Sequence, residues 1–72
     1  MLEYGYIYEG EFRQGDRNGY GRLIYLLMNQ IYTYTGFFKD NKFNGFGCLE
    51  SNGPLNRIQR GVWKDSVFLE DW

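Results

Sequence analysis

Hydrophobic and polar positions alternate along two neighbouring stretches near the start of the chain. In the first, Tyr8, Gly10 and Phe12 share one parity, whereas charged residues occupy the other. The second, residues 19–25, alternates as well, and the residues between the two stretches, RQGDRN, are rich in turn formers. Period-two alternation is typical of a strand with one buried face. The sequence therefore predicts a β-hairpin over residues 8–25.

The same pattern returns 26 residues later, over residues 34–49. The residues that are identical at this offset are Tyr6/Tyr32, Tyr8/Tyr34, Gly10/Gly36, Phe12/Phe38, Asn18/Asn44, Gly19/Gly45, Gly21/Gly47 and Leu23/Leu49. A fixed period of this size is typical of repeat proteins, whose units stack only on their neighbours. We therefore expect an all-β fold of successive antiparallel hairpins.

Glycines recur at fixed places within each unit. Gly15 is predicted to lie in the turn with a positive φ, and Asn41 takes its place in the second unit, because these residue types tolerate that conformation. Other glycines fall inside strands, where glycine is normally unfavourable: Gly10, Gly19 and Gly21. We expect large rings to need this space, and we place Tyr8 and Phe12 over these glycines.

The pattern Y-x-G-x-F, a turn, and then N-G-x-G-x-L resembles the MORN repeat, named for the membrane occupation and recognition nexus. The first unit matches at Tyr8, Gly10, Phe12, Gly15, Gly19, Tyr20, Gly21, Leu23 and Tyr25, and the second at Tyr34, Gly36, Phe38, Gly45, Gly47 and Leu49. The second unit departs at Phe37, where Glu or a similar residue is usual, and at Ser51. The resemblance implies an elongated, twisted, single-layer sheet. By this resemblance the chain contains about two and a half repeats, over residues 6–31, 32–56 and 57–69.

Composition and charge narrow the classes of function. A net charge of −1, from eight bases and nine acids, does not favour nucleic-acid binding. The chain has no histidine and one cysteine, Cys48, so it has neither an internal disulfide nor a Cys/His cluster for zinc. The acids show no paired spacing and there is no His-based acid–base pair. We expect no enzyme activity, no cofactor and no metal, and an intracellular, reducing compartment.

Two apolar stretches before the second unit are candidate contact sites. Tyr4, Tyr6 and Tyr8 extend the first strand; their rings either pack on the sheet or stack on a partner at its open end. Leu26, Leu27 and Met28 stand in a connection that is longer and more apolar than the resemblance implies. Either the second strand runs on, with residues 28–30 as the turn, or these side chains form an apolar docking patch.

The end of the chain offers two further candidates. Residues 51–54, SNGP, predict a turn, and residues 59–63 predict the last strand. After Ser66 the repeat pattern fails. The segment 67–72, which contains Phe68 and Trp72, either caps the stack by folding over its end or is an arm that docks elsewhere.

Basic side chains are expected in a row at the hairpin turns. Arg13, Lys39 and Lys64 occupy equivalent positions, and Arg17 and Lys42 lie near them. Acidic residues alternate with these bases: Asp16, Asp40 and Asp65. The row is therefore either a mixed, solvated edge or an edge that binds anions such as acidic phospholipid.

Our first functional hypothesis is a non-enzymatic structural or adaptor module, a small subunit that contacts other proteins in a larger assembly. The resemblance implies cytoskeletal, ciliary or membrane-associated scaffolds. The alternative is a module that binds acidic phospholipid through the five basic residues just named. A net charge of −1 argues against strong membrane attraction.

Overall fold

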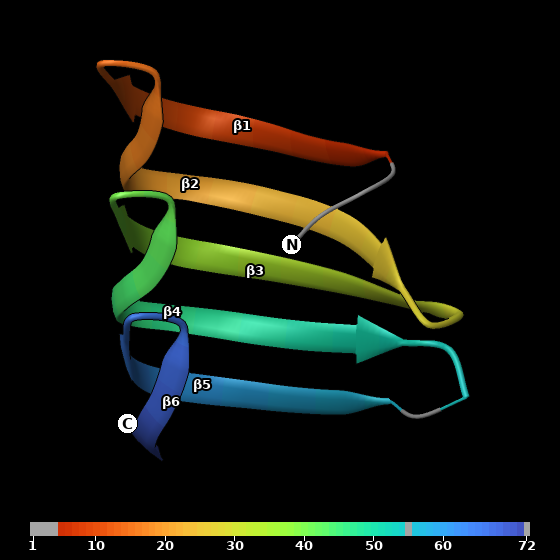
Figure 1. Ribbon diagram of the computed structural model, residues 1–72. Coiled ribbons are helices and arrows are strands. Elements are labelled where there is room, and N and C mark those ends of the chain that lie inside the picture. Colours follow the sequence, from red (N-terminus) through yellow and green to blue (C-terminus); the bar gives the residue numbers. More distant parts are fainter. Residues whose placement is uncertain (1–4, 55, 72) are drawn as a thin grey trace.

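Six antiparallel strands form one sheet, in chain order and without a crossover (Figure 1). The computed structural model describes residues 5–54 and 56–71. The strands are β1 (Tyr6–Arg13), β2 (Asp16–Leu27), β3 (Gln30–Lys39), β4 (Lys42–Asn52), β5 (Arg57–Lys64) and β6 (Val67–Asp71). The molecule measures 35 × 30 × 17 Å, which fits one twisted layer. The all-β, single-layer prediction is confirmed.

The strands pair as three hairpins that stack side by side: hairpin 1 (β1–β2), hairpin 2 (β3–β4) and hairpin 3 (β5–β6). Two-residue turns close them, at residues 14–15, 40–41 and 65–66, with positive φ at both positions. The positive φ values of Gly15 (85°) and Asn41 (70°) confirm the prediction for these residues. Such turns match the right-handed twist of the flanking strands.

The connection between hairpins 1 and 2 is another two-residue turn. Met28 and Asn29 have φ of 48° and 69°, and Leu27 pairs with Gln30 across the turn. The interpretation in which the second strand runs on is therefore confirmed, although Gln30 already belongs to β3. The predicted turn after β4 is present too, since Asn52 ends that strand and the Gly53 N–H donates to Asn56 Oδ1 (3.2 Å).

Hairpins 1 and 2 each contain a bulge near the turn. In hairpin 1, Gly10 pairs with Gly21 but Phe12 pairs with Arg17, so Glu11 alone faces residues 18–20. Hairpin 2 repeats this register, with Phe37 facing residues 44–46. Extra residues on one strand bend it and increase its twist. The hairpin tips therefore turn away from the plane of the sheet.

The glycines inside the strands make room for tyrosine rings. A Cβ on Gly21 would run into the Tyr8 ring, and a Cβ on Gly47 would run into the Tyr34 ring. The prediction is thus confirmed for the tyrosines. Phe12 is not among the nearest neighbours of these glycines, because Gly19 lies instead under Glu11. The Glu11 carboxylate accepts the Tyr20 N–H at 2.6 Å within the bulge.

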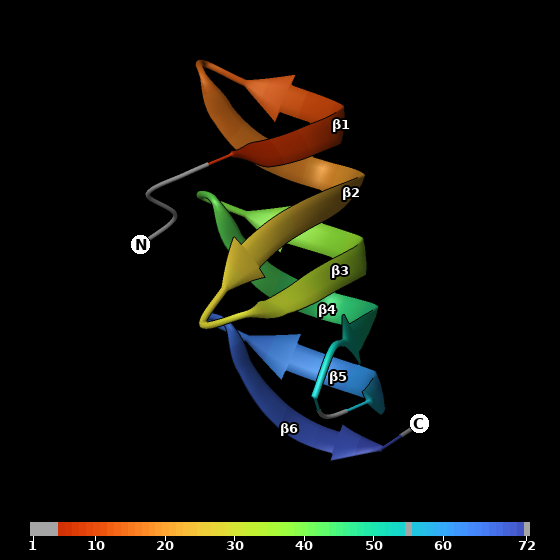
Figure 2. The ribbon, with the colours of Figure 1, turned by 90° about the vertical axis from the view of Figure 1, so that its right-hand side faces the viewer.

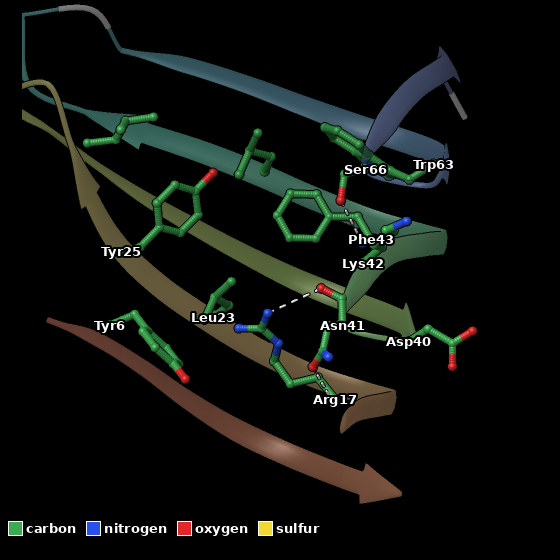
Figure 3. A pocket seen from close by; sticks show the side chains of 12 residues that line it. Tyr6, Arg17, Leu23, Tyr25, Asp40, Asn41, Lys42, Phe43, Trp63 and Ser66 are labelled. Carbon is green, nitrogen blue, oxygen red and sulfur yellow. Dashed lines mark hydrogen bonds between the residues drawn. The ribbon is translucent and has the colours of Figure 1, made fainter. Parts of the chain in front are cut away.

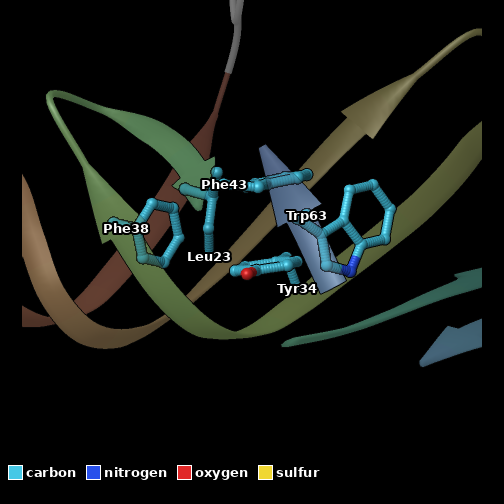
Figure 4. Packing of buried hydrophobic residues seen from close by; sticks show 5 residues of the cluster. All are labelled: Leu23, Tyr34, Phe38, Phe43 and Trp63. Carbon is cyan, nitrogen blue, oxygen red and sulfur yellow. The ribbon is translucent and has the colours of Figure 1, made fainter. Parts of the chain in front are cut away.

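The core is small and lies on one face of the sheet (Figure 4). Its buried hydrophobic residues are Leu23, Tyr34, Phe38, Phe43 and Trp63. Tyr34 stands at its centre, fully buried, with its ring stacked on Phe43 at 3.8 Å between centroids and an angle of 4°. Its hydroxyl donates to the Phe37 carbonyl (2.9 Å). Burial raises the pKa of Tyr34 to about 12.

Residues 67–71 correct the prediction for the end of the chain. They form β6, which pairs along β5 and completes hairpin 3, so they neither fold over the end of the stack nor leave it as an arm. Gly61 pairs with Asp71, ten residues on, because the bulge of hairpin 3 has one residue fewer than those of hairpins 1 and 2. The glycine spacing of the first units therefore could not reveal this strand. Trp72 and Tyr4, two predicted contact residues, lie outside the described residues.

Candidate functional site

A groove of about 830 Å³ runs over the face that carries the core (Figure 3). Figure 2 shows that both ends of β2 and β3 bend to the same side, so that these strands curve around this face. The groove is lined by Tyr6, Arg17, Leu23, Tyr25, Leu27, Asp40, Asn41, Lys42, Phe43, Leu49, Trp63 and Ser66.

Strand residues form the floor of the groove and hairpin tips form one wall. On β2, the alternate residues Leu23, Tyr25 and Leu27 face the groove, as period two requires. The wall contains residues from all three hairpin tips, among them Arg17 and Ser66. Within residues 5–54 and 56–71 no second layer covers this floor, and Leu27 is 47% exposed.

Hydrogen bonds hold the tips together. The Asn41 N–H donates to the Arg17 carbonyl (3.0 Å), and the Arg17 N–H donates to Asn41 Oδ1 (2.8 Å). The next pair repeats this arrangement: the Ser66 N–H donates to the Phe43 carbonyl (2.9 Å), and the Phe43 N–H donates to Ser66 Oγ (3.2 Å). The second turn residue of each hairpin thus docks on the hairpin before it. Gly15 occupies this position in hairpin 1 and has no side-chain oxygen that could accept such a hydrogen bond.

The Arg17 guanidinium lies among aromatic rings. Its Cζ is 5.5 Å from the centre of the Tyr6 ring and 5.9 Å from those of Tyr8 and Phe38. One terminal nitrogen, Nη2, donates to the Asn41 carbonyl (3.2 Å). The strand pairing makes Arg17 the counterpart of Phe43 and Phe68 in the later hairpins. The groove therefore has a cationic end where the repeat would place a ring.

Tyr25 lines the groove, and Tyr8 lies beside it. The Tyr25 ring stacks on Tyr32, with centroids 5.1 Å apart, and burial raises the pKa of the Tyr25 hydroxyl. Burial also raises the pKa of Tyr8, against the opposing effect of the Arg17 charge. These hydroxyls therefore stay protonated at neutral pH, so they can both donate and accept hydrogen bonds.

The structure separates the predicted contact residues. Tyr6 lies in the groove and Tyr8 beside it, packed against the core. Leu27 lines the groove, whereas its neighbour Leu26 pairs with Ile31 on the opposite face, because successive residues of a strand alternate. Met28 stands at the turn and is 88% exposed. These residues do not form one patch.

Phe68, from β6, packs on the Trp63 ring with centroids 5.0 Å apart and is partly buried. Its ring belongs to the aromatic row of the core face. Several groove residues were not predicted from the sequence: Tyr25, Asn41, Phe43, Trp63 and Ser66. The positive φ expected at Asn41 marked the turn, but nothing in the pattern showed that hairpin tips bend over the sheet.

The basic residues lie at the tips, as predicted. Arg13, Lys39 and Lys64 each occupy the last strand position before a turn and are exposed, as is Lys42. The three tips lie on the same side of the sheet (Figure 1). Arg17 differs from the other four, since its side chain is held by Asn41 and the surrounding rings.

The opposite face of the sheet also carries exposed apolar residues. They are Ile7, Leu26, Ile31, Phe37, Phe46 and Ile58. Cys48 lies on this face as a free thiol, and burial raises its pKa, with a further rise from Glu50 and a decrease from Arg60. No His, Cys, Asp and Glu side chains gather as metal ligands within residues 5–54 and 56–71. Over the same ranges, no helix is long and apolar enough to cross a membrane.

A family model described as the MORN repeat matches residues 8–25 and 34–53, more than half of the chain. The protein belongs to the MORN-repeat family. The family is one of non-catalytic repeat modules that contact proteins or lipids. Hairpin 3 lies beyond the two matched segments, although its strand pairing continues theirs. Neither the curated proteins nor the solved structures contain a match to this chain.

Proposed function

We propose that this MORN-repeat protein is a non-enzymatic adaptor subunit, which binds a partner protein in its groove and thereby joins a larger assembly. The groove carries the proposal. It has a volume of about 830 Å³ and is lined by residues of all three hairpins. Because strand residues and hairpin tips both line the groove, an extended peptide in it would contact the floor and one wall.

The chemistry of the groove favours a peptide. Its accessible apolar surface includes Tyr6, 51% exposed, and Leu27, 47% exposed. Exposed clusters of this kind mark contacts between proteins. Tyrosine and arginine, both present here, are enriched among the residues that dominate binding energy in interfaces.

Site-specific photo-crosslinking tests the proposal. A photoreactive residue in place of Leu27 should crosslink to the partner in cells, because this position lines the groove. The matched control places the same residue at Leu26, which is 57% exposed on the opposite face. Crosslinks from position 27 and few from position 26 support the groove. Equal yields, or crosslinks only from position 26, would contradict it.

The alternative, binding of acidic phospholipid, depends on the row of bases at the tips. The bases of this alternative are Arg13, Arg17, Lys39, Lys42 and Lys64, with Asp16, Asp40 and Asp65 beside them. The acids offset most of this positive charge, so the groove is the better-supported surface. Flotation with vesicles of phosphatidylcholine, with and without phosphatidylinositol bisphosphate, separates the two. Salt-sensitive flotation only with the anionic lipid would favour the alternative.

The proposal extends to the location of the assembly. A cytoskeletal or ciliary scaffold in a reducing compartment is what the family resemblance and the lone cysteine support. Fluorescence microscopy of the tagged chain in its source cells tests this. Staining of cytoskeletal or ciliary structures supports the proposal, and signal confined to a secretory compartment would contradict it.

A further inference from the structure

The guanidinium of Arg17 has no anionic partner among the described residues. The ion pair formed between those residues is Arg22–Glu9 (3.4 Å), and Arg17 forms none there. Its Nε–H is the one buried side-chain polar group, among residues 5–54 and 56–71, without a hydrogen-bond partner. The terminal nitrogen Nη2 has a hydrogen bond, to an uncharged carbonyl. Because Nε is buried, an anion would contact the guanidinium through its terminal nitrogens, and a partly buried cation is stabilised by such a contact.

Arg17 also stands at a place where the other hairpins have an aromatic residue. At the equivalent places hairpins 2 and 3 carry Phe43 and Phe68, whose rings pack against the aromatic row. An aromatic ring would fill this place as well and leave no charge behind. Arginine here supplies a planar group with several N–H donors, which matches a carboxylate in two-point geometry.

The surroundings fix the guanidinium and shape what can approach it. Rings of Tyr6, Tyr8 and Phe38 lie around it. The Asn41 carbonyl holds Nη2, and Figure 3 shows Tyr6 and Asn41 on either side of the Arg17 side chain. A side chain held in this way loses little conformational freedom on binding. Asp40 and Lys42, both at the tip of hairpin 2, also line the groove and contribute one charge of each sign.

We propose that Arg17 binds a carboxylate side chain of the partner, so that the groove recognises an apolar peptide segment with an Asp or Glu at one position. The acid meets Arg17 at the cationic end of the groove. The neighbouring apolar side chains of the peptide lie over Tyr6, Tyr25 and Leu27. This inference deepens the proposed function and rests on it.

A selection from displayed random peptides tests the inference. Peptides of 12 residues are selected on the wild-type chain and on the variants Arg17→Gln and Arg17→Phe. Arg17→Gln removes the charge and keeps polarity, and Arg17→Phe installs the ring that hairpins 2 and 3 carry. Circular dichroism is used first to check that each variant is folded. Wild-type chain should select apolar peptides with Asp or Glu at a fixed place, and both variants should lose the acid while keeping the apolar residues.

The best wild-type peptide and its amide analogue then complete a double-mutant cycle. Replacing the acid with Asn or Gln should weaken binding to the wild-type chain about tenfold and binding to Arg17→Gln less than about twofold. Equal losses on both proteins, or selected peptides without an acid, would overturn the inference. If those peptides still require Leu27, as binding to Leu27→Ser shows, the proposed function stands. If no peptide binds the groove, both proposals fall.

Discussion

The two junctions between hairpins share their backbone hydrogen bonds but differ in their side chains. At the first junction, Asn41 docks on Arg17, and at the second, Ser66 docks on Phe43, each with an N–H to carbonyl bond and a side-chain oxygen that accepts an N–H. The second junction is filled by rings, whereas the first holds a guanidinium. The same repeat can thus build a buried core at one end and a charged, accessible site at the other.

Exposure also differs between the core and the outer strand of hairpin 1. Phe43 is 8% exposed at the second junction, while the Phe12 ring at the outer side of hairpin 1 is 61% exposed. Burial of apolar surface stabilises folds by about 25 cal/mol per Å², so hairpins 2 and 3 should provide most of the stability. Hairpin 1 should contribute less to stability and more to recognition.

The largest expected contrast is between truncations at the two junctions. Phe43→Ala should lower the free energy of unfolding by about 3–5 kcal/mol, because it opens a cavity beside Tyr34 and Trp63. Arg17→Ala should lower it by only about 1 kcal/mol, the value of partly exposed cation–π contacts. Urea unfolding followed by circular dichroism measures both. Similar losses for the two variants would contradict the comparison.

A second contrast concerns the glycines beneath the tyrosines. Gly47→Ala would force a methyl group into the buried Tyr34 ring, and Gly21→Ala would force one into Tyr8. Overpacking of this kind costs roughly 1–3 kcal/mol. We expect the larger value for Gly47→Ala, since Tyr34 is fully buried and cannot move aside, whereas Tyr8 is partly exposed. The same unfolding measurement decides, and a larger loss for Gly21→Ala would reverse the ranking.

The side chains that lock the tips give a smaller effect. Asn41→Gly and Ser66→Gly remove the side chain but leave a residue that accepts positive φ. Each variant then has glycine at the second turn position, as hairpin 1 does at Gly15. Each should lower the free energy of unfolding by about 1 kcal/mol, the value of a typical hydrogen bond. Asn41→Gly should cost more, because Asn41 also donates to Asp16 Oδ1 (2.8 Å). Melting temperatures of the two variants compare them, and no loss in either would show that the backbone bonds suffice.

The smallest effect appears only at alkaline pH. Tyr34 has a folded pKa of about 12, above the ordinary tyrosine value of 10.0, so the folded state holds this proton longer than the unfolded state. Stability from this group is therefore complete below pH 10 and is lost as pH rises towards 12. Tyr34→Phe should flatten that fall, whereas Tyr20→Phe, at an exposed position, should not. Unfolding measured from about pH 9 to about pH 11.5 tests this, and identical curves for all three proteins would contradict it.

Much of the fold could be predicted from the sequence because the residues that recur in each repeat determine local backbone conformation. Alternation showed the strands, and the glycine and asparagine of the turns showed where φ is positive. Hairpin 3 was missed in part because β6 carries Asp71 where the earlier units carry glycine, and because its bulge is one residue shorter. A pattern with fixed spacing cannot detect a strand whose register has changed.

The candidate site was harder to predict because it depends on curvature. Leu26 and Leu27 are adjacent in the sequence, yet they lie on opposite faces of the sheet. The bulges bring Arg17, Asn41 and Ser66 over the floor of the groove, and no alternation pattern encodes that bend. Arg17 was predicted as one base in a row at the turns. The strand pairing showed that Arg17 belongs to the aromatic row, because it pairs with Phe12 as Phe43 pairs with Phe38.

If the groove joins this chain to a larger assembly, a change in the groove should alter the mass at which the chain runs under native conditions. The wild-type chain, Leu27→Ser and Leu26→Ser are each isolated gently from source cells and measured by native mass spectrometry. We expect wild type and Leu26→Ser to run in a large complex and Leu27→Ser to run near its own mass of 8.6 kDa. A wild-type chain that runs folded and alone near 8.6 kDa, or a Leu27→Ser chain retained as fully as wild type, would contradict it.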